Sequence, residues 1–285
     1  MPKKYSGTGG SIANRLLAAL PRDEYNQLRR SSTAVQSPQK RVHNELGDMN
    51  TTDLRILLWD IDGTILRSAK ATTFIDYTGS VLEAVFGTAG RIDHVPLTGK
   101  TDLQSIADAL ADEFTRTDIV ERLQEISNSY LCEIERAISQ GAEFHVLPGV
   151  REALEAISHN ARYHSALLTG NFETTAWFKV NLADLSDYFD VPGAFGDQSY
   201  DRRELPRFAA QRISSHLRMD LQPSQFIVIG DTPDDIACAR HFGARSIAVA
   251  SGHSYCGDDL RACEPDAVLP DLSDTAQFMS TLERL

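Results

Sequence analysis

The chain has 285 residues, of which 42% are hydrophobic and 24% charged, a composition typical of a folded globular protein with one large or two smaller domains. Its 28 Lys and Arg residues against 40 Asp and Glu residues give a formal net charge of −12, which excludes a generally basic nucleic-acid-binding protein. None of the four cysteines forms a Cys-x-x-Cys pair, and no apolar run approaches the about 20 residues that span a bilayer. We therefore expect a cytoplasmic protein with no membrane or nucleic-acid partner.

The N-terminal segment differs in composition from the rest of the chain. Residues 7–10 are rich in glycine, and residues 31–40 are mostly polar and contain a proline. Such composition is typical of linkers rather than of a packed core. We predict that residues 1–52 form a flexible N-terminal extension.

From residue 53 onward, short apolar runs alternate with helical patterns. The apolar runs, each followed by turn residues, occupy residues 55–59, 165–168, 226–229 and 246–250. The helical patterns between and after them occupy residues 150–160, 173–184, 204–218 and 234–242. Continuous apolar runs suit strands that are buried on both faces of a parallel sheet, and their alternation with helices indicates a doubly wound, Rossmann-like α/β fold. Such sheets bind ligands at the carboxyl ends of their strands.

One interval breaks this alternation. Residues 68–145 contain no convincing buried strand. Their helical patterns occupy residues 71–86, 102–112 and 117–139. A helical insertion directly after the first strand and its acidic loop would lie over the carboxyl edge of the sheet as a lid. We predict a core formed by residues 53–67 and 146–285 and an all-helical cap formed by residues 68–145.

Three aspartates follow two of the predicted strands. Asp60 and Asp62 come directly after the first strand and flank one residue, so both carboxylates point to the same side of an extended segment. Asp231 follows the strand at 226–229. Close carboxylates repel one another unless a proton or a cation lies near, and Mg²⁺ prefers such hard oxygen donors. The set predicts a Mg²⁺ site, because a turn or a helix cap explains one aspartate but not several strand ends.

The segment Thr169-Gly170-Asn171 follows the strand predicted at 165–168. It offers a hydroxyl group, an unhindered backbone N–H and a helix N-terminus, which can cradle phosphate oxygens. The same tripeptide is also typical of a turn in which Asn171 is the helix N-cap. Its position at a strand end favours phosphate binding.

Together these segments resemble a known family. Asp60-Ile-Asp-Gly-Thr64, Thr169-Gly-Asn171 and Gly230-Asp-Thr-Pro-Asp-Asp235 resemble, in order, motifs one, two and four of the haloacid dehalogenase superfamily of phosphotransferases. The similarity extends from Leu54 to Ser273. Pro148-Gly-Val150 and Leu269-Pro-Asp-Leu-Ser273 are similar to the phosphoglycolate-phosphatase-like branch, in which the helical insertion is a C1 cap.

The resemblance implies a two-step reaction. Asp60 would attack phosphorus and form an aspartyl-phosphate. Asp62 would protonate the leaving alkoxide and then deprotonate the hydrolytic water. Dehalogenating members of the superfamily lack an acid at the position of Asp62, since a halide needs no proton. The chain therefore resembles the phosphatases.

The resemblance also implies the groups that bind metal and phosphate. Mg²⁺ would be bound by Asp60, by the backbone carbonyl of Asp62 and by Asp231, with Asp235 as a support of the metal site. Asp235 also fits a helix start with Thr232 as N-cap, and both interpretations can hold together. The phosphoryl oxygens would be bound by Thr169, Gly170 and Asn171.

Motif three departs from the family pattern, which has a lysine. This chain offers Arg202 and Arg203, either of which could offset the acids and bind phosphate. Counting back from Pro206 favours Arg203, whereas the Asp-Arg-x-Glu-Leu pattern favours Arg202, which we prefer slightly. In the cap, Lys100 or Thr101 could contact the leaving group, or they could belong to an ordinary surface turn and a capped helix.

These observations predict a Mg²⁺-dependent phosphatase that hydrolyses a small phosphorylated metabolite. One alternative is a phosphomutase of the β-phosphoglucomutase type, which shares every catalytic residue. The other is a non-enzymatic protein that binds a phosphorylated metabolite, which the presence of both Asp60 and Asp62 disfavours. The sequence leaves open which phosphomonoester is bound and the oligomeric state.

Overall fold

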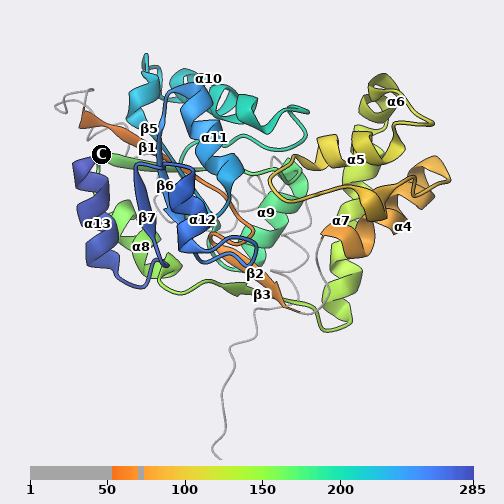
Figure 1. Cartoon of the computed structure of the whole chain (residues 1–285), viewed down its shortest axis with the longest axis horizontal. Coiled ribbons are helices and arrows are strands. Elements are labelled where there is room, and N and C mark those ends of the chain that lie inside the picture. Colours follow the sequence, from red (N-terminus) through yellow and green to blue (C-terminus); the bar gives the residue numbers. More distant parts are fainter. Residues whose placement is uncertain (1–52, 70–73) are drawn as a thin grey trace, which may run out of the picture. The chain divides into compact units, whose positions relative to one another are not determined.

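The structure, a computed structural model, describes residues 53–69 and 74–285 (Figure 1). The N-terminal extension predicted for residues 1–52 lies outside the described residues, as does the start of the first predicted cap helix. Among the described residues, none of the helices has both the length and the apolar character that crossing a membrane requires.

A five-stranded parallel sheet forms the centre of the core, with the strand order β4-β1-β5-β6-β7. Its strands are β1 (Arg55–Trp59), β4 (Tyr163–Leu167), β5 (Phe226–Gly230), β6 (Arg245–Val249) and β7 (Ala267–Leu269). The register pairs Trp59 with Leu167 on one side and with Ile229 on the other. The residues that follow β1, β4 and β5 therefore emerge side by side at one edge of the sheet.

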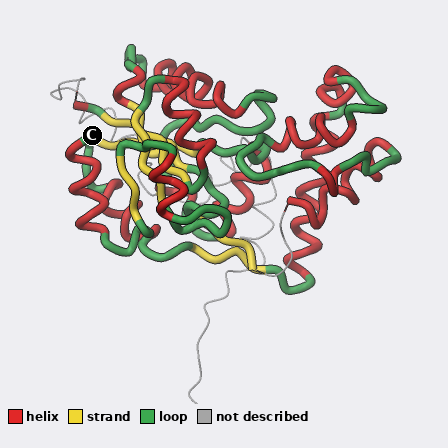
Figure 2. Tube along the Cα trace, in the orientation of Figure 1, coloured by secondary structure: helices red, strands yellow, loops and turns green. Residues whose placement is uncertain are grey.

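Helices cover both faces of this sheet (Figure 2). They are α8 (Val150–Ser158), α9 (Glu173–Leu182), α10 (Leu205–Leu217), α11 (Pro233–Phe242), α12 (Gly257–Ala262) and α13 (Thr275–Arg284), with the short 3-10 helices η3 (Ser186–Tyr188), η4 (Arg202–Glu204) and η5 (Pro223–Gln225). Alternate residues of β1 supply the two sides of the core. Leu57 and Trp59 pack with α8, α9 and α13, and Ile56 and Leu58 pack with α10 and α11. Each such side chain, fully buried, contributes about 1.5–3 kcal/mol to stability. The fold confirms the predicted doubly wound α/β core.

The inserted cap contains the helices α4 (Phe74–Phe86), α5 (Asp102–Leu110), α6 (Arg116–Glu121) and α7 (Leu123–Ser139) and the 3-10 helix η2 (Ile92–His94). The helix expected over residues 117–139 is divided at Arg122, which ends α6 and precedes α7. Thr115 and Asp118 form a capping box that starts α6. The cap has its own apolar cluster, which Phe172 and Phe178 of the core join.

A short antiparallel ribbon links the cap to the core. It consists of β2 (Leu66–Ala69) and β3 (Glu143–Val146), which the sequence analysis did not predict inside residues 68–145. The exposure of β3 alternates between exposed and intermediate, so its residues lack the continuous apolar run of a buried strand. The cap is therefore helical apart from the ribbon at its base.

Candidate active site

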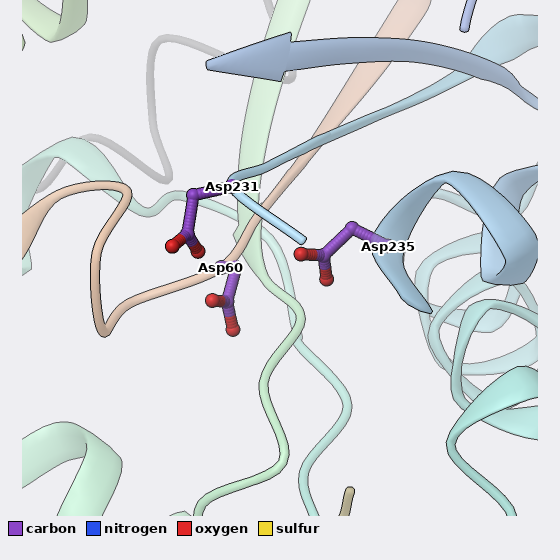
Figure 3. Close-up of side chains that lie close together, drawn as sticks. All are labelled: Asp60, Asp231 and Asp235. Carbon is purple, nitrogen blue, oxygen red and sulfur yellow. The ribbon is translucent and has the colours of Figure 1, made fainter. Parts of the chain in front are cut away.

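Three buried carboxylates meet at the carboxyl edge of the sheet. Asp60, Asp231 and Asp235 each offer an oxygen, and these oxygens lie within 4.8 Å of one another (Figure 3). Asp60 is 4% exposed, Asp231 5% and Asp235 2%. Asp60 follows β1, and its backbone N–H donates to the carbonyl of Ile229 at 2.9 Å, which fixes it beside β5. The predicted acids from two strands thus converge, joined by Asp235 from α11.

Glycine at position 63 makes this convergence possible. Gly63 has φ +91°, the left-handed region that glycine adopts without strain. A Cβ atom at this position would collide with the carboxylate of Asp231. The hydroxyl of Thr64, one residue later, donates to Oδ1 of Asp231 at 3.3 Å. In the turn after β1, Gly63 therefore lets the backbone approach Asp231, and Thr64 orients the Asp231 carboxylate.

Arg202 is the cation that reaches the acids. Its Nη2 lies 3.0 Å from Oδ1 of Asp60 and 2.5 Å from Oδ1 of Asp235. Arg203 instead points to the surface, where it pairs with Asp201 at 2.7 Å. Asp201 is the N-cap of η4 and accepts the backbone N–H of Arg203, which turns the two arginines in different directions. The structure thus brings Arg202, but not Arg203, to the site.

The electrostatics of the acid cluster favour added positive charge. Burial raises the pKa of Asp60 to about 7, against the lowering effect of Arg202. Burial, with the negative charges of Asp60 and Asp235, raises the pKa of Asp231 to about 8. One arginine therefore does not offset three buried carboxylates. A set of hard oxygen donors short of positive charge fits a divalent cation such as Mg²⁺.

Asp235 also starts α11, as one interpretation of the sequence predicted. Its Oδ2 accepts from the backbone N–H of Thr232 at 3.1 Å and from the Thr232 hydroxyl at 2.6 Å. Thr232 in turn caps the backbone N–H of Asp235. The helix cap and the position beside Asp60 coexist in one side chain, because the two functions use different carboxylate oxygens.

The segment Thr169-Gly170-Asn171, called the phosphate loop after its predicted role, lies beside Asp62. The backbone N–H of Leu168 donates to the carbonyl of Trp59 at 2.7 Å, which aligns the end of β4 with that of β1. The side-chain Nδ2 of Asn171 lies 2.8 Å from Oδ2 of Asp62 and 2.9 Å from the Thr169 hydroxyl. Phe172, not Asn171, is the N-cap of α9. The Asn171 amide therefore faces the site instead of capping the helix.

Lys179 is a site residue that the sequence analysis missed. Its Nζ lies 2.8 and 3.0 Å from the two carboxylate oxygens of Asp62 and 2.6 Å from Oδ1 of Asn171. Only 4% of the residue is exposed. The signal available in the sequence was a lysine between Phe178 and Val180, in the helix that follows the phosphate loop.

The side chains of the cap residues Lys100 and Thr101 are turned toward α5. Lys100 Nζ pairs with Oδ2 of Asp108 at 2.7 Å. Thr101 is buried, and its hydroxyl caps α5 by accepting the backbone N–H of Gln104 at 3.1 Å. Among the described residues, neither side chain has a hydrogen bond or ion pair to the phosphate loop. The cap touches that loop instead through the backbone of this segment and through Asp102.

The α/β core and the acid cluster agree with the resemblance of the motifs to the haloacid dehalogenase superfamily, and a comparison with family models tests that resemblance directly. The model of haloacid dehalogenase-like hydrolases matches residues 54–243, more than half of the chain. The chain belongs to this family, which confirms what its motifs indicated.

Individual proteins show the same relationship. The phosphoglycolate phosphatase of Vibrio vulnificus is 25% identical over 236 residues, which cover 79% of this chain and 96% of that protein. The pyrophosphatase PpaX of Bacillus cereus is 21% identical over 239 residues, covering 81% and 99%. A crystal structure described as a predicted phosphoglycolate phosphatase from Haemophilus somnus has a TM-score of 0.54 at 17% identity and covers 81% of this chain and 100% of that one. A haloacid dehalogenase-like protein from Streptococcus pneumoniae has a TM-score of 0.53 at 20% identity, covering 80% and 99%. Both solved structures have the same fold as this chain.

Proposed function

We propose that this protein is a Mg²⁺-dependent phosphatase that hydrolyses a small phosphomonoester through an aspartyl-phosphate on Asp60. One observation carries the proposal. Asp60 clusters with the buried acids Asp231 and Asp235 and pairs with Arg202, while Asp62, two residues later, accepts from Asn171 of the phosphate loop. The phosphatases among the similar proteins support the same reaction class.

The first chemical step belongs to Asp60. A carboxylate oxygen of Asp60 attacks phosphorus, the bond from phosphorus to the ester oxygen breaks, and an aspartyl-phosphate forms. The carboxylates of Asp60 and Asp231 and the backbone carbonyl of Asp62 would hold Mg²⁺, with Asp235 as support. The bound ion would neutralise negative charge on the phosphoryl group and its acid neighbours. Arg202 supplies further positive charge from within the chain.

Asp62 is the proton donor and acceptor. It gives a proton to the leaving alkoxide in the first step and takes one from the hydrolytic water in the second. Its carboxylate is 44% exposed, so it can face a substrate, while Lys179 and Asn171 fix its orientation. Thr169, Gly170 and Asn171 bind the phosphoryl oxygens through a hydroxyl, a backbone N–H and a side-chain amide. An acid at this position serves an alkoxide leaving group rather than a halide.

Hydrolysis of phosphate esters with and without Mg²⁺ tests this proposal. A suitable panel contains the esters p-nitrophenyl phosphate, phosphoglycolate and sugar phosphates, together with the anhydride pyrophosphate. We expect phosphate release that requires Mg²⁺ and is abolished in Asp60→Asn. The matched control is Asp220→Asn, which changes an exposed aspartate before β5, at the opposite end of that strand from Asp231. Equal turnover by wild type and Asp60→Asn contradicts the assignment of the nucleophile.

The same panel separates the alternatives. A phosphomutase would convert one sugar phosphate into its isomer and release little inorganic phosphate, although it uses the same aspartates. A non-enzymatic binding protein would bind one of the esters and leave all of them intact. Identifying the ester with the highest kcat/KM would also give the substrate class.

A further inference from the structure

One short segment of the cap, residues 99–102, contacts the phosphate loop. Asp102 is the first residue of α5. Its backbone N–H donates to the carbonyl of Gly170 at 2.7 Å, and its Oδ2 accepts from the backbone N–H of Phe172 at 3.1 Å. Gly170 and Phe172 are the two neighbours of Asn171. A single cap residue therefore holds the chain on both sides of the amide that faces Asp62.

The bond from Phe172 to Asp102 supports the start of α9, which has no side-chain cap of its own. Phe172 is the N-cap of this helix, and its side chain has no atom that can accept a hydrogen bond. The Asp102 carboxylate accepts instead from the backbone N–H of Phe172 itself, one of the N–H groups at a helix start that have no partner within the helix. Phe172 is fully buried. Water is therefore a poor replacement if the carboxylate is removed.

The glycines at this contact show how closely the segments fit. A Cβ atom on Gly170 would collide with the carbonyl oxygen of Lys100 in the cap. A Cβ atom on Gly196 would collide with the carbonyl oxygen of Gly170. The backbone N–H of Gly196 also donates to the carbonyl of Asn171 at 2.7 Å. The phosphate loop is thus held from the core by Gly196 and from the cap by Asp102.

We propose that Asp102 is a positioning residue that ties the cap to the phosphate loop and holds Asn171 in its phosphate-binding orientation. The inference rests on the proposed phosphatase function. Residues 99–102 then support the binding of the phosphoryl group, which all substrates share, by positioning Asn171, rather than selecting the leaving group through Lys100 or Thr101. Because binding couplings are reciprocal, a bound phosphate also stabilises the seating of this cap segment.

Titration of the Mg²⁺-loaded protein with inorganic phosphate, followed by calorimetry, measures this role without turnover. We compare Asp102→Ala and Asp102→Leu, which lack the acceptor, the second of them with the same branching of the side chain. The matched control is Asp112→Ala, which removes an exposed aspartate just beyond the other end of α5, where it pairs with Arg91. Steady-state kcat/KM is measured in parallel for several esters that differ in the leaving group.

We expect both Asp102 variants to bind phosphate about tenfold more weakly, equivalent to about 1.4 kcal/mol, with unchanged binding stoichiometry. We expect kcat/KM to fall by a similar factor for every ester, so that the ratio between any two esters stays that of wild type. Asp112→Ala should match wild type in both measurements. A loss of folded protein would lower the stoichiometry rather than the affinity.

Two results would overturn the inference. One is unchanged phosphate affinity in folded Asp102→Ala or Asp102→Leu. The other is a loss of kcat/KM that differs strongly between esters, which would make Asp102 a leaving-group contact. If wild type hydrolyses none of the esters, the proposed function fails. The phosphate titration still decides the role of Asp102 in that case.

Discussion

Replacement of Lys179 by methionine should impair the proton transfer assigned to Asp62 more than it impairs phosphate binding. Lys179→Met keeps the length of the side chain and removes the Nζ that contacts both oxygens of Asp62 and Oδ1 of Asn171 at 2.6–3.0 Å. When Asp62 gives its proton to the leaving group it becomes a carboxylate, and Lys179 stabilises that charge. The variant loses this stabilisation in the transition state.

The structure sets the size of the effect. A hydrogen bond to a charged group contributes about 1.5–3 kcal/mol. The Asp62 carboxylate is 44% exposed, so solvent screening reduces the loss to about 1–2 kcal/mol. This corresponds to a decrease of about 5- to 30-fold in kcat/KM for an alkyl phosphate, whose leaving group needs the proton. A p-nitrophenolate leaving group departs with little protonation, so kcat/KM for p-nitrophenyl phosphate should fall by at most about threefold.

The assay compares glycerol phosphate with p-nitrophenyl phosphate for wild type, Lys179→Met and the control Arg91→Met, which removes an exposed cation of the cap. Asp62→Asn should show the same preference for the better leaving group, more strongly. Equal losses of Lys179→Met on both substrates would refute the reasoning, because a general distortion of the site lowers the two reactions alike.

Two further predictions concern the acid cluster. The pKa values of Asp60 and Asp231, raised mainly by burial to about 7 and about 8, mean that the metal-free folded protein binds more protons than the unfolded chain between about pH 4 and about pH 8. The metal-free protein should therefore lose stability to urea as pH rises from about 4 to about 8, and Mg²⁺ should reduce or reverse that trend. If the stability to urea changes with pH in the same way with and without Mg²⁺, this prediction is contradicted. Gly63→Ala places a Cβ atom against the Asp231 carboxylate and should lower Mg²⁺ affinity measured by calorimetry. Gly87→Ala is the matched control, because Gly87 also has a positive φ but open space around it, and it should cost stability by strain alone.

The core could be predicted from sequence because its strands are continuous apolar runs with polar turns after them. The run at 55–59 coincides with β1, and that at 226–229 differs from β5 by one residue. The ribbon formed by β2 and β3 escaped prediction, since Arg67 and Ser68 interrupt one strand and Glu143 and His145 the other, so neither is an apolar run. The break between α6 and α7 at Arg122 escaped it too, because the apolar spacing continues across that residue.

The sequence predicts those site residues that directly follow a strand. It does not predict those whose position in the site depends on tertiary contacts. Asp60 and Asp231 meet because the parallel register brings two strand ends together. Spacing could not choose between the neighbouring arginines of η4, since the choice depends on how Asp201 caps that short helix. Lys179 and Asp102 lie on helices. The apolar spacing of a helix predicts which face is buried, but not which residue Lys179 or Asp102 contacts.

Direct detection of a phosphoryl group on Asp60 tests the central claim most sharply. The measurement uses Asp62→Asn with Mg²⁺ and p-nitrophenyl phosphate, since this leaving group departs with little protonation while the missing base slows hydrolysis of the intermediate. The reaction is quenched in acid within a single turnover and digested, and the peptides are analysed by mass spectrometry. We predict an added phosphoryl group on Asp60, absent from a sample without Mg²⁺. Phosphate release without a phosphorylated Asp60 peptide at any time, or a phosphoryl group on another residue, would contradict the account.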